Sequence, residues 1–274
     1  MSVAKTAERI TLGWLLSAAL CVGAMAEPIP VKKMEGVVHG FLVLRSLDGE
    51  VLAEGDLVQV PERGRIESRL TFRFRDGSIH DERVNFTQDR VFLLESYHLL
   101  QKGPSFPKPL EATLERAENR FEVRHGDEDG SAEVLEGKLE LPRDVYNGMF
   151  FTLLKNIDAD AAKTTVSMIA FTPDPRVVNL EVSAQGEEPF TVAEISRRAV
   201  RYLLNIEVTG LTGLLAKLFG KDPPPLHTWM LHGEAPTFVR FRGFLYLGGP
   251  VWSIELASPV WPGETTEPAA FAGR

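Results

Sequence analysis

Alternation of apolar and polar residues dominates the chain and predicts β-strands. Within residues 69–75, 178–182 and 200–208, every second position is apolar and most positions between are polar or charged. A period of two with one apolar face is typical of half-buried antiparallel strands. Turn signals recur between such segments, among them Asp48-Gly49, Asp76-Gly77 and Asp129-Gly130. This spacing predicts about a dozen strands in one large sheet.

Two segments depart from this alternation and predict amphipathic helices. The first, "LPRDVYNGMFFTLLKNI", predicts a helix over residues 143–156. Its apolar residues recur at helical spacing and are Val145, Tyr146, Met149, Phe150, Leu153, Leu154 and Ile157. The second predicts a helix over residues 211–219, which Gly220 and the proline run after it would end. We therefore expect a mainly β fold, a large curved antiparallel sheet or open half-barrel covered by two amphipathic helices.

The N-terminus has the features of a secretory signal. Lys5 and Arg9 precede an apolar run that ends in Ala24-Met25-Ala26. A basic start, a short apolar stretch and small residues at the exit predict cleavage after Ala26 and a periplasmic or secreted location. A retained membrane anchor is the alternative, but the run is short for a span of about 20 apolar residues. A lipid anchor on Cys21 is disfavoured because the large Leu20 precedes it.

Cleavage at this point defines the predicted domains and changes the chemistry of the chain. Residues 1–26 form the signal peptide, residues 27–261 a single β-rich domain, and residues 262–274 a disordered tail rich in Pro, Glu and Ala. The signal contains two cations and one anion, so the net charge changes from −8 to −9, which argues against a nucleic-acid partner. It also contains the only cysteine, which excludes disulfides and thiol chemistry in the mature chain.

Motifs of catalysis and cofactor binding are missing from the sequence. It has no G-x-S-x-G, H-E-x-x-H, phosphate loop or dinucleotide motif, and we expect no cofactor. The six histidines are scattered. His227 and His232 are five apart, which places them on opposite faces of a strand and makes them a poor metal chelate.

The segment "LTFRFRDGSIHDERVNF" predicts a hairpin that carries the best candidate for acid–base chemistry. A loop of residues 76–77 would pair Phe72 with Asp81 and place charges opposite aromatic rings. A loop of residues 76–78 would instead pair Leu70 with Val84 and Arg73 with Asp81, which gathers the apolar residues on one face. We prefer this second register.

In the preferred register, His80 and Glu82 share the apolar face of the hairpin. An imidazole and a carboxyl group two residues apart on such a face can form an acid–base pair. The alternative is that they are ordinary polar residues at the hydrated end of a hairpin. Convergence of both groups on one pocket would favour the first interpretation.

Four segments together suggest a family. They are "LTFRFRDGSIHDERVNFTQ", "LLQKGPSFPKPLEATL", "LPRDVYNGMFFTLLKN" and "LGGPVWSIELASPVW". Over nearly the whole mature chain they resemble a group of uncharacterised exported bacterial proteins. More distantly, the layout is similar to a periplasmic family of unknown function with a curved antiparallel sheet. That shape resembles the half-barrel of the lipoprotein carriers LolA and LolB, in which helices close an apolar concavity over lipid. These resemblances imply a fold and assign no residue a role.

Three functions are compatible with the sequence. The first is a non-enzymatic exported protein that binds an apolar or amphipathic, lipid-like ligand. Its predicted ligand-binding residues are Phe72, Phe74, Phe150, Leu154, Leu214, Leu215 and Phe219. The second is a structural or interaction module of the cell envelope, with an envelope protein as partner and no ligand cavity. The third is an envelope hydrolase that uses His80 and Glu82 with His98 or Lys102, and it requires these side chains to converge.

Overall fold

The computed structural model describes residues 27–126, 131–172, 175–192, 195–207 and 224–257. Within these ranges 14 strands form one continuous antiparallel sheet in the order β8-β7-β6-β5-β4-β3-β2-β1-β14-β13-β12-β11-β10-β9. The strands are β1 (Val38–Arg45), β2 (Val51–Glu62), β3 (Arg65–Phe74), β4 (Ile79–Gln88), β5 (Phe92–Lys102), β6 (Leu110–Glu115), β7 (Arg120–Gly126), β8 (Ala132–Lys138), β9 (Thr164–Ala170), β10 (Arg176–Val192), β11 (Ile195–Ile206), β12 (Leu226–Leu231), β13 (Thr237–Gly243) and β14 (Trp252–Leu256). The prediction of a mainly β, antiparallel fold is confirmed.

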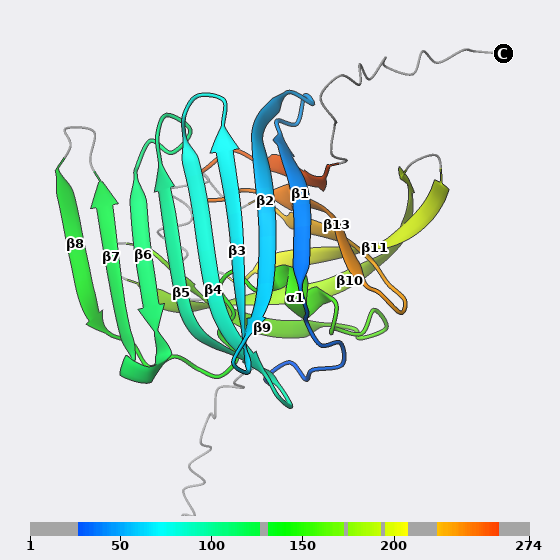
Figure 1. Ribbon diagram of the computed structural model, residues 1–274, viewed down its shortest axis with the longest axis horizontal. Coiled ribbons are helices and arrows are strands. Elements are labelled where there is room, and N and C mark those ends of the chain that lie inside the picture. The colour runs from blue at the N-terminus through cyan, green and yellow to red at the C-terminus, as the bar shows by residue number, and fades with distance from the viewer. Residues whose placement is uncertain (1–26, 127–130, 173–174, 193–194, 208–223, 258–274) are drawn as a thin grey trace, which may run out of the picture.

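The sheet folds over on itself without closing. Figure 1 shows β2 to β8 as one wall, with β9, β10 and β11 crossing behind it. The two parts join where the first strand pairs with the last, with Leu42 opposite Leu256. The inner face between the walls forms the core, and the outer face meets solvent.

The alternation seen in the sequence defines these two faces. On β3, Ile66, Leu70, Phe72 and Phe74 are buried on the inner face, while the arginines between them are exposed. The alternating apolar residues predicted in two later segments are buried in the same way, and these are Val178, Leu180, Val182, Val200, Tyr202 and Leu204. Burial of every second side chain therefore accounts for the pattern.

The predicted register of the β3–β4 hairpin is wrong by two residues. Phe72 lies opposite His80 and Leu70 opposite Glu82. The chain reverses through residues 75–77, and Gly77 has a φ of 86° that suits glycine. The Asp76 side chain accepts a hydrogen bond from the Ser78 N–H at 2.8 Å and closes the turn one residue earlier than predicted.

A shift of two residues leaves every side chain on the same face of the sheet, so His80 and Glu82 lie on the inner face as predicted. It changes the ion pairs of the outer face. Asp81 binds the Arg69 guanidinium rather than that of Arg73. Arg73 instead contacts Asp56 on β2 at 3.3 Å.

The predicted helix over residues 143–156 is mostly not a helix. Helix α1 spans only Phe150–Leu154, and a 3₁₀ turn, η1, spans Arg116–Glu118. Residues 142–147 instead run beside β9, where the Tyr146 N–H donates to the Ser167 carbonyl at 2.9 Å and the Asn147 side chain pairs with the Ile169 backbone. The edge of β9 has backbone N–H and C=O groups that need partners, and a helix over these residues would leave those groups unpaired.

Three predictions fall on residues that the structure does not describe. They are the signal peptide at residues 1–26, the second helix over residues 211–219 and the tail from residue 262. In the described ranges, no helix has the length and apolar character required to cross a bilayer.

Two segments of the chain cover the inner face of the sheet. Residues 27–37, called here the N-terminal strap, bury Ile29, whose N–H donates to the Tyr146 hydroxyl at 2.8 Å. In residues 139–157, nearly all the apolar side chains that the sequence placed on one helical face are buried, including Met149 and Leu153. Figure 1 shows α1 between the two walls of the sheet. These segments pack with the inner-face side chains in one hydrophobic core.

Candidate functional site

His80 lies in an apolar part of the inner face and has one polar partner. It is 3% exposed and contacts the rings of Phe72 and Phe106. Gln101, opposite on β5, lies 3.0 Å from its Nδ1 and donates a second hydrogen bond to the Leu245 carbonyl at 2.9 Å. Burial lowers the pKa of His80 to about 4, although the Asp81 charge acts in the opposite direction. The imidazole is therefore neutral at neutral pH.

Glu82 is paired with a tyrosine rather than with His80. The Tyr97 hydroxyl donates a hydrogen bond of 2.7 Å to Glu82 Oε1, and the Tyr97 ring stacks on Phe171 at 5.7 Å. Glu82 keeps some exposed surface, but its carboxyl group lies in apolar surroundings. Burial raises the pKa of Glu82, and the hydrogen bond from Tyr97 partly opposes this shift.

Gly148 brings the backbone of the inner segment close to this pair. Its φ is 70°, and a side-chain carbon at this position would lie 2.4 Å from Val84 Cγ2 and 3.1 Å from Glu82 Cδ. Only glycine combines this backbone conformation with such a close approach. The backbone of the Asn147-Gly148-Met149 turn therefore packs against the Glu82–Tyr97 pair.

The residues of the hydrolase hypothesis do not converge. His98 is on the outer face, 3.2 Å from Glu111. Lys102 is exposed at the end of β5. His80 and Glu82 share the inner face, but each is bonded to a different residue of β5. The sequence could not identify Tyr97 and Gln101 as these partners because both lie on the next strand, whose register was unknown.

The predicted ligand-binding residues that the structure describes lie mostly in the core. Phe72, Phe74 and Leu154 are buried, and Phe150 is half-buried. The other three, Leu214, Leu215 and Phe219, are outside the described residues. Near these four residues the inner face is packed with side chains of the chain itself.

Two surface hollows are found elsewhere, on the outer face. The larger is about 780 Å³ and is lined by Glu62, Arg63, Arg65, Glu67, Asn85, Leu93, Glu95, Ser96, Glu115, Arg116 and Ala117. The smaller is about 270 Å³ and is lined by Glu111, Thr113, Glu122 and Arg124. Both are open and mostly polar in their lining residues, and neither includes a predicted ligand-binding residue.

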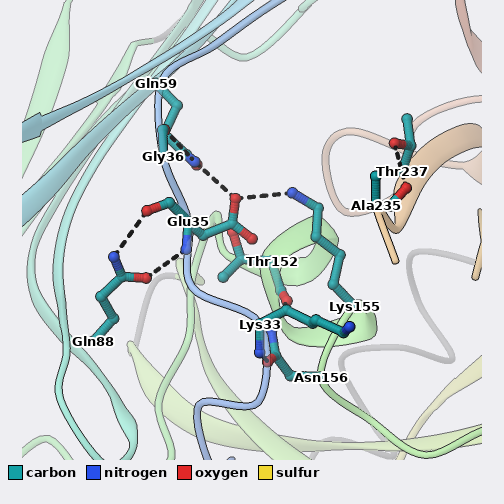
Figure 2. A network of polar contacts seen from close by, with 10 residues as sticks. All are labelled: Lys33, Glu35, Gly36, Gln59, Gln88, Thr152, Lys155, Asn156, Ala235 and Thr237. Atoms are coloured by element: carbon teal, nitrogen blue, oxygen red, sulfur yellow. Dashed lines mark hydrogen bonds and ion pairs between the residues drawn. The ribbon is translucent and has the colours of Figure 1, made fainter. Parts of the chain in front are cut away.

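A buried polar network, which sequence reasoning missed, fixes the N-terminal strap over α1 (Figure 2). The Glu35 carboxylate accepts hydrogen bonds of 2.8 Å from Lys155 Nζ and from Gln59 Nε2. The side chain of Gln88 exchanges two hydrogen bonds with the Glu35 backbone, at 2.7 and 2.9 Å. Asn156 Oδ1 accepts from the N–H groups of residues 32 and 33.

The charges of this network are well removed from water. The Glu35 side chain is 3% exposed and that of Lys155 is 18% exposed. In the sequence, Glu35 follows two lysines and a methionine and has no apolar periodicity around it, so nothing indicated its burial. The network joins the strap, β2, β4 and α1.

Comparisons with known proteins assign no family. No family model matches the chain, and no curated protein matches it. A crystal structure from Brucella abortus, described as a beta-barrel-like protein of domain of unknown function DUF1849, aligns with a TM-score of 0.45 at 9% sequence identity. The alignment covers 85% of this chain and 98% of that chain. A similarity at this level assigns neither a family nor a function.

Proposed function

We propose that the protein is an exported, non-enzymatic interaction module of the cell envelope, built on a packed half-barrel. The observation that supports this proposal most is the filled inner face. The N-terminal strap and residues 139–157 occupy the space between the walls where a lipid carrier would hold its ligand. The features of residues 1–26 support export.

The contacts of the strap favour a permanent cover over a movable lid. A lid that opens for a ligand is expected to have few buried contacts. The strap buries the Ile29 side chain, donates the Ile29 N–H to the Tyr146 hydroxyl and forms a buried ion pair between Glu35 and Lys155. Opening it would expose a paired carboxylate and leave Lys155 without its partner.

The separation of the titratable groups disfavours the hydrolase. A general acid–base pair must reach the same substrate atoms. The Glu82 carboxyl is covered by the backbone at Gly148, and His80 is enclosed by aromatic rings.

The proposal is tested by expressing the full chain and purifying it from the periplasmic fraction. We expect an intact mass that corresponds to a chain beginning at Glu27, and organic extraction that yields no stoichiometric lipid. A periplasmic protein without ligand, purified in parallel, gives the background of adventitious lipid. Retention in the cytoplasm would contradict export.

Binding of an apolar or amphipathic ligand is the alternative proposal. Three of its seven predicted residues lie in the stretch 208–223, which the structure does not describe. One equivalent of a lipid species in the extract of the pure protein would establish this alternative and overturn the packed module.

A further inference from the structure

A group of cationic side chains surrounds Trp229 on the outer face of β11, β12 and β13. Trp229 lies opposite Arg201 on one side and Arg240 on the other. His227, two residues earlier on β12, lies opposite Arg242. Glu188 of β10 completes the group, which we call the Trp229 cluster. Because these residues alternate with buried ones such as Met230, their side chains project away from the core.

Trp229 holds two guanidinium groups in place. The Cζ atoms of Arg240 and Arg242 lie 5.7 and 5.9 Å from the centre of its ring. The indole N–H donates to Glu188 Oε2 at 2.7 Å, which fixes the ring, and the residue is 9% exposed. Cation–π contacts of this kind order arginine side chains before a ligand arrives.

The positive charges of the cluster are not fully compensated. Arg240 binds Glu255 at 2.8 Å, and Arg201 contacts Glu188 at 3.3 Å. In the described part of the chain, Arg242 has no ion pair with a carboxylate, and its side chain is exposed. The Nδ1 atom of His227 is buried and also has no hydrogen-bond partner in these residues. This occurs in a chain whose net charge is −8.

The local potential at His227 is positive as a result. Burial lowers the pKa of His227 first, and the charges of Arg201 and Arg242 lower it further, while Glu188 opposes them. A positive potential focused over a rigid surface attracts anions.

We propose that the Trp229 cluster binds a phosphate group, with the guanidinium of Arg242 as the main contact. The planar fork of an arginine donates two parallel hydrogen bonds to phosphate oxygens. Arg201 and Arg240 add positive charge on the two flanking strands. The phosphate is either free or the headgroup of an anionic lipid, and both present the same oxygens. This inference goes beyond the proposed interaction module and does not depend on export.

The test uses the purified protein with inorganic phosphate and with vesicles. Calorimetric titration with phosphate at low salt measures affinity, and imidazole NMR spectra follow His227. We expect saturable binding and a rise in the pKa of His227, because a bound anion offsets the charges of Arg201 and Arg242. Cosedimentation with phosphatidylglycerol vesicles, against phosphatidylcholine vesicles, distinguishes a headgroup from free phosphate.

Two variants with the same change of charge locate the site. Arg242→Gln should weaken binding at least about tenfold, as expected for loss of a charge-assisted contact. Arg198→Gln is the matched control, since Arg198 is on β11 and is paired with Glu187 at 2.8 Å outside the cluster. It should retain affinity within about twofold. Equal loss in both variants, or no binding of either phosphate or phosphatidylglycerol by the wild type, would overturn the proposal.

Discussion

At the scale of single residues, Glu35 and Lys155 show how a charge is kept inside the core. Removing a carboxylate and an ammonium group from water costs several kcal/mol each, and their attraction offsets this only with good geometry and further hydrogen bonds. Gln59 supplies one of these to the carboxylate, and Gln88 fixes the backbone of Glu35. The pair therefore specifies where the strap lies and is a weak source of net stability.

Removing one partner of this pair should be costly. We expect Lys155→Met to lower the free energy of unfolding by about 3–5 kcal/mol, because the buried Glu35 carboxylate loses its counter-charge. Adding Glu35→Gln should recover part of this loss, which urea unfolding of the single and double variants would measure. The control is Lys163→Met, since Lys163 is largely exposed and its pair with Glu181 should be worth less than about 1 kcal/mol. Equal losses in the two lysine variants would show that the buried pair is unimportant.

His80 should make the stability of the protein sensitive to acid. Its pKa in the folded state is about 4, below the ordinary 6.5, so the unfolded chain takes up a proton that the folded chain excludes. The lowered pKa of His80 therefore contributes about 3 kcal/mol to the free energy of unfolding. This contribution is fully present above pH 6.5 and is lost as the pH falls toward 4.

The comparison of His80→Gln with the wild type isolates this contribution, because Glu82 titrates in both proteins. Denaturant unfolding at several pH values between 4 and 7 should give a flatter profile for the variant. His39→Gln is the control, since the His39 side chain is exposed and lies beside Asp56 and Phe41 on the outer surface. Parallel profiles for His80→Gln and the wild type would contradict the assignment of a neutral, buried imidazole.

At the scale of elements, the turn at Gly148 decides how the inner segment packs. Its positive φ ends any continuous helix from residue 143, and the lack of a side chain lets the backbone approach Val84 and Glu82. Helix α1 can therefore begin only after this turn.

Alanine at position 148 should be far more costly than alanine at another glycine of similar conformation. Gly148→Ala adds a contact of 2.4 Å to backbone strain, and we expect a loss of about 3 kcal/mol in unfolding free energy. Gly186 has a φ of 100° but no atom within 4 Å of an added carbon, so Gly186→Ala should cost only about 1 kcal/mol. Thermal and denaturant unfolding of both variants measures the difference, and similar losses would show that the close approach is unimportant.

The elements also show what the sequence can and cannot predict. Alternation placed His80 and Glu82 on the correct face because burial acts on every second residue. It could not distinguish two registers that differ by two residues, since both keep the apolar residues together. Residues 143–149 satisfy helical spacing, yet they form two turns, and the residues between these turns bond to the edge of β9. The positions of Tyr97 and Gln101 depend on the register between β4 and β5. This register shifts at a bulge in β5 opposite Asn85 and Phe86 of β4, and no apolar pattern reveals it.

At the scale of the whole molecule, the strap makes the N-terminal residues of the described chain part of the core. It contacts β2 and β4, and it also bonds to Tyr146 and Lys155 around α1, which are more than a hundred residues away in sequence. Stability therefore depends on a segment that a domain boundary drawn at the first strand would omit.

A chain that begins at residue 38 should be strongly destabilised. It loses the buried Ile29 and leaves Lys155 without a partner, and we expect a loss of about 5 kcal/mol or more in unfolding free energy. Hydrogen exchange at α1 should accelerate most. Ile29→Ala alone is the milder comparison, at about 2–4 kcal/mol. Native-like hydrogen exchange in the truncated chain would show that the strap does not contribute to the stability of the fold.

The two end strands of the sheet differ in how far their edges are covered, and this difference affects how chains can associate. The edge at β9 is covered by residues 142–147, while β8 pairs only with β7 in the described structure. Growth of a fibre by strand addition needs two open edges, one to receive a chain and one to offer the next. Among the described residues, a contact through this end of the sheet would join β8 to another β8, so association through these strands would form a pair of chains.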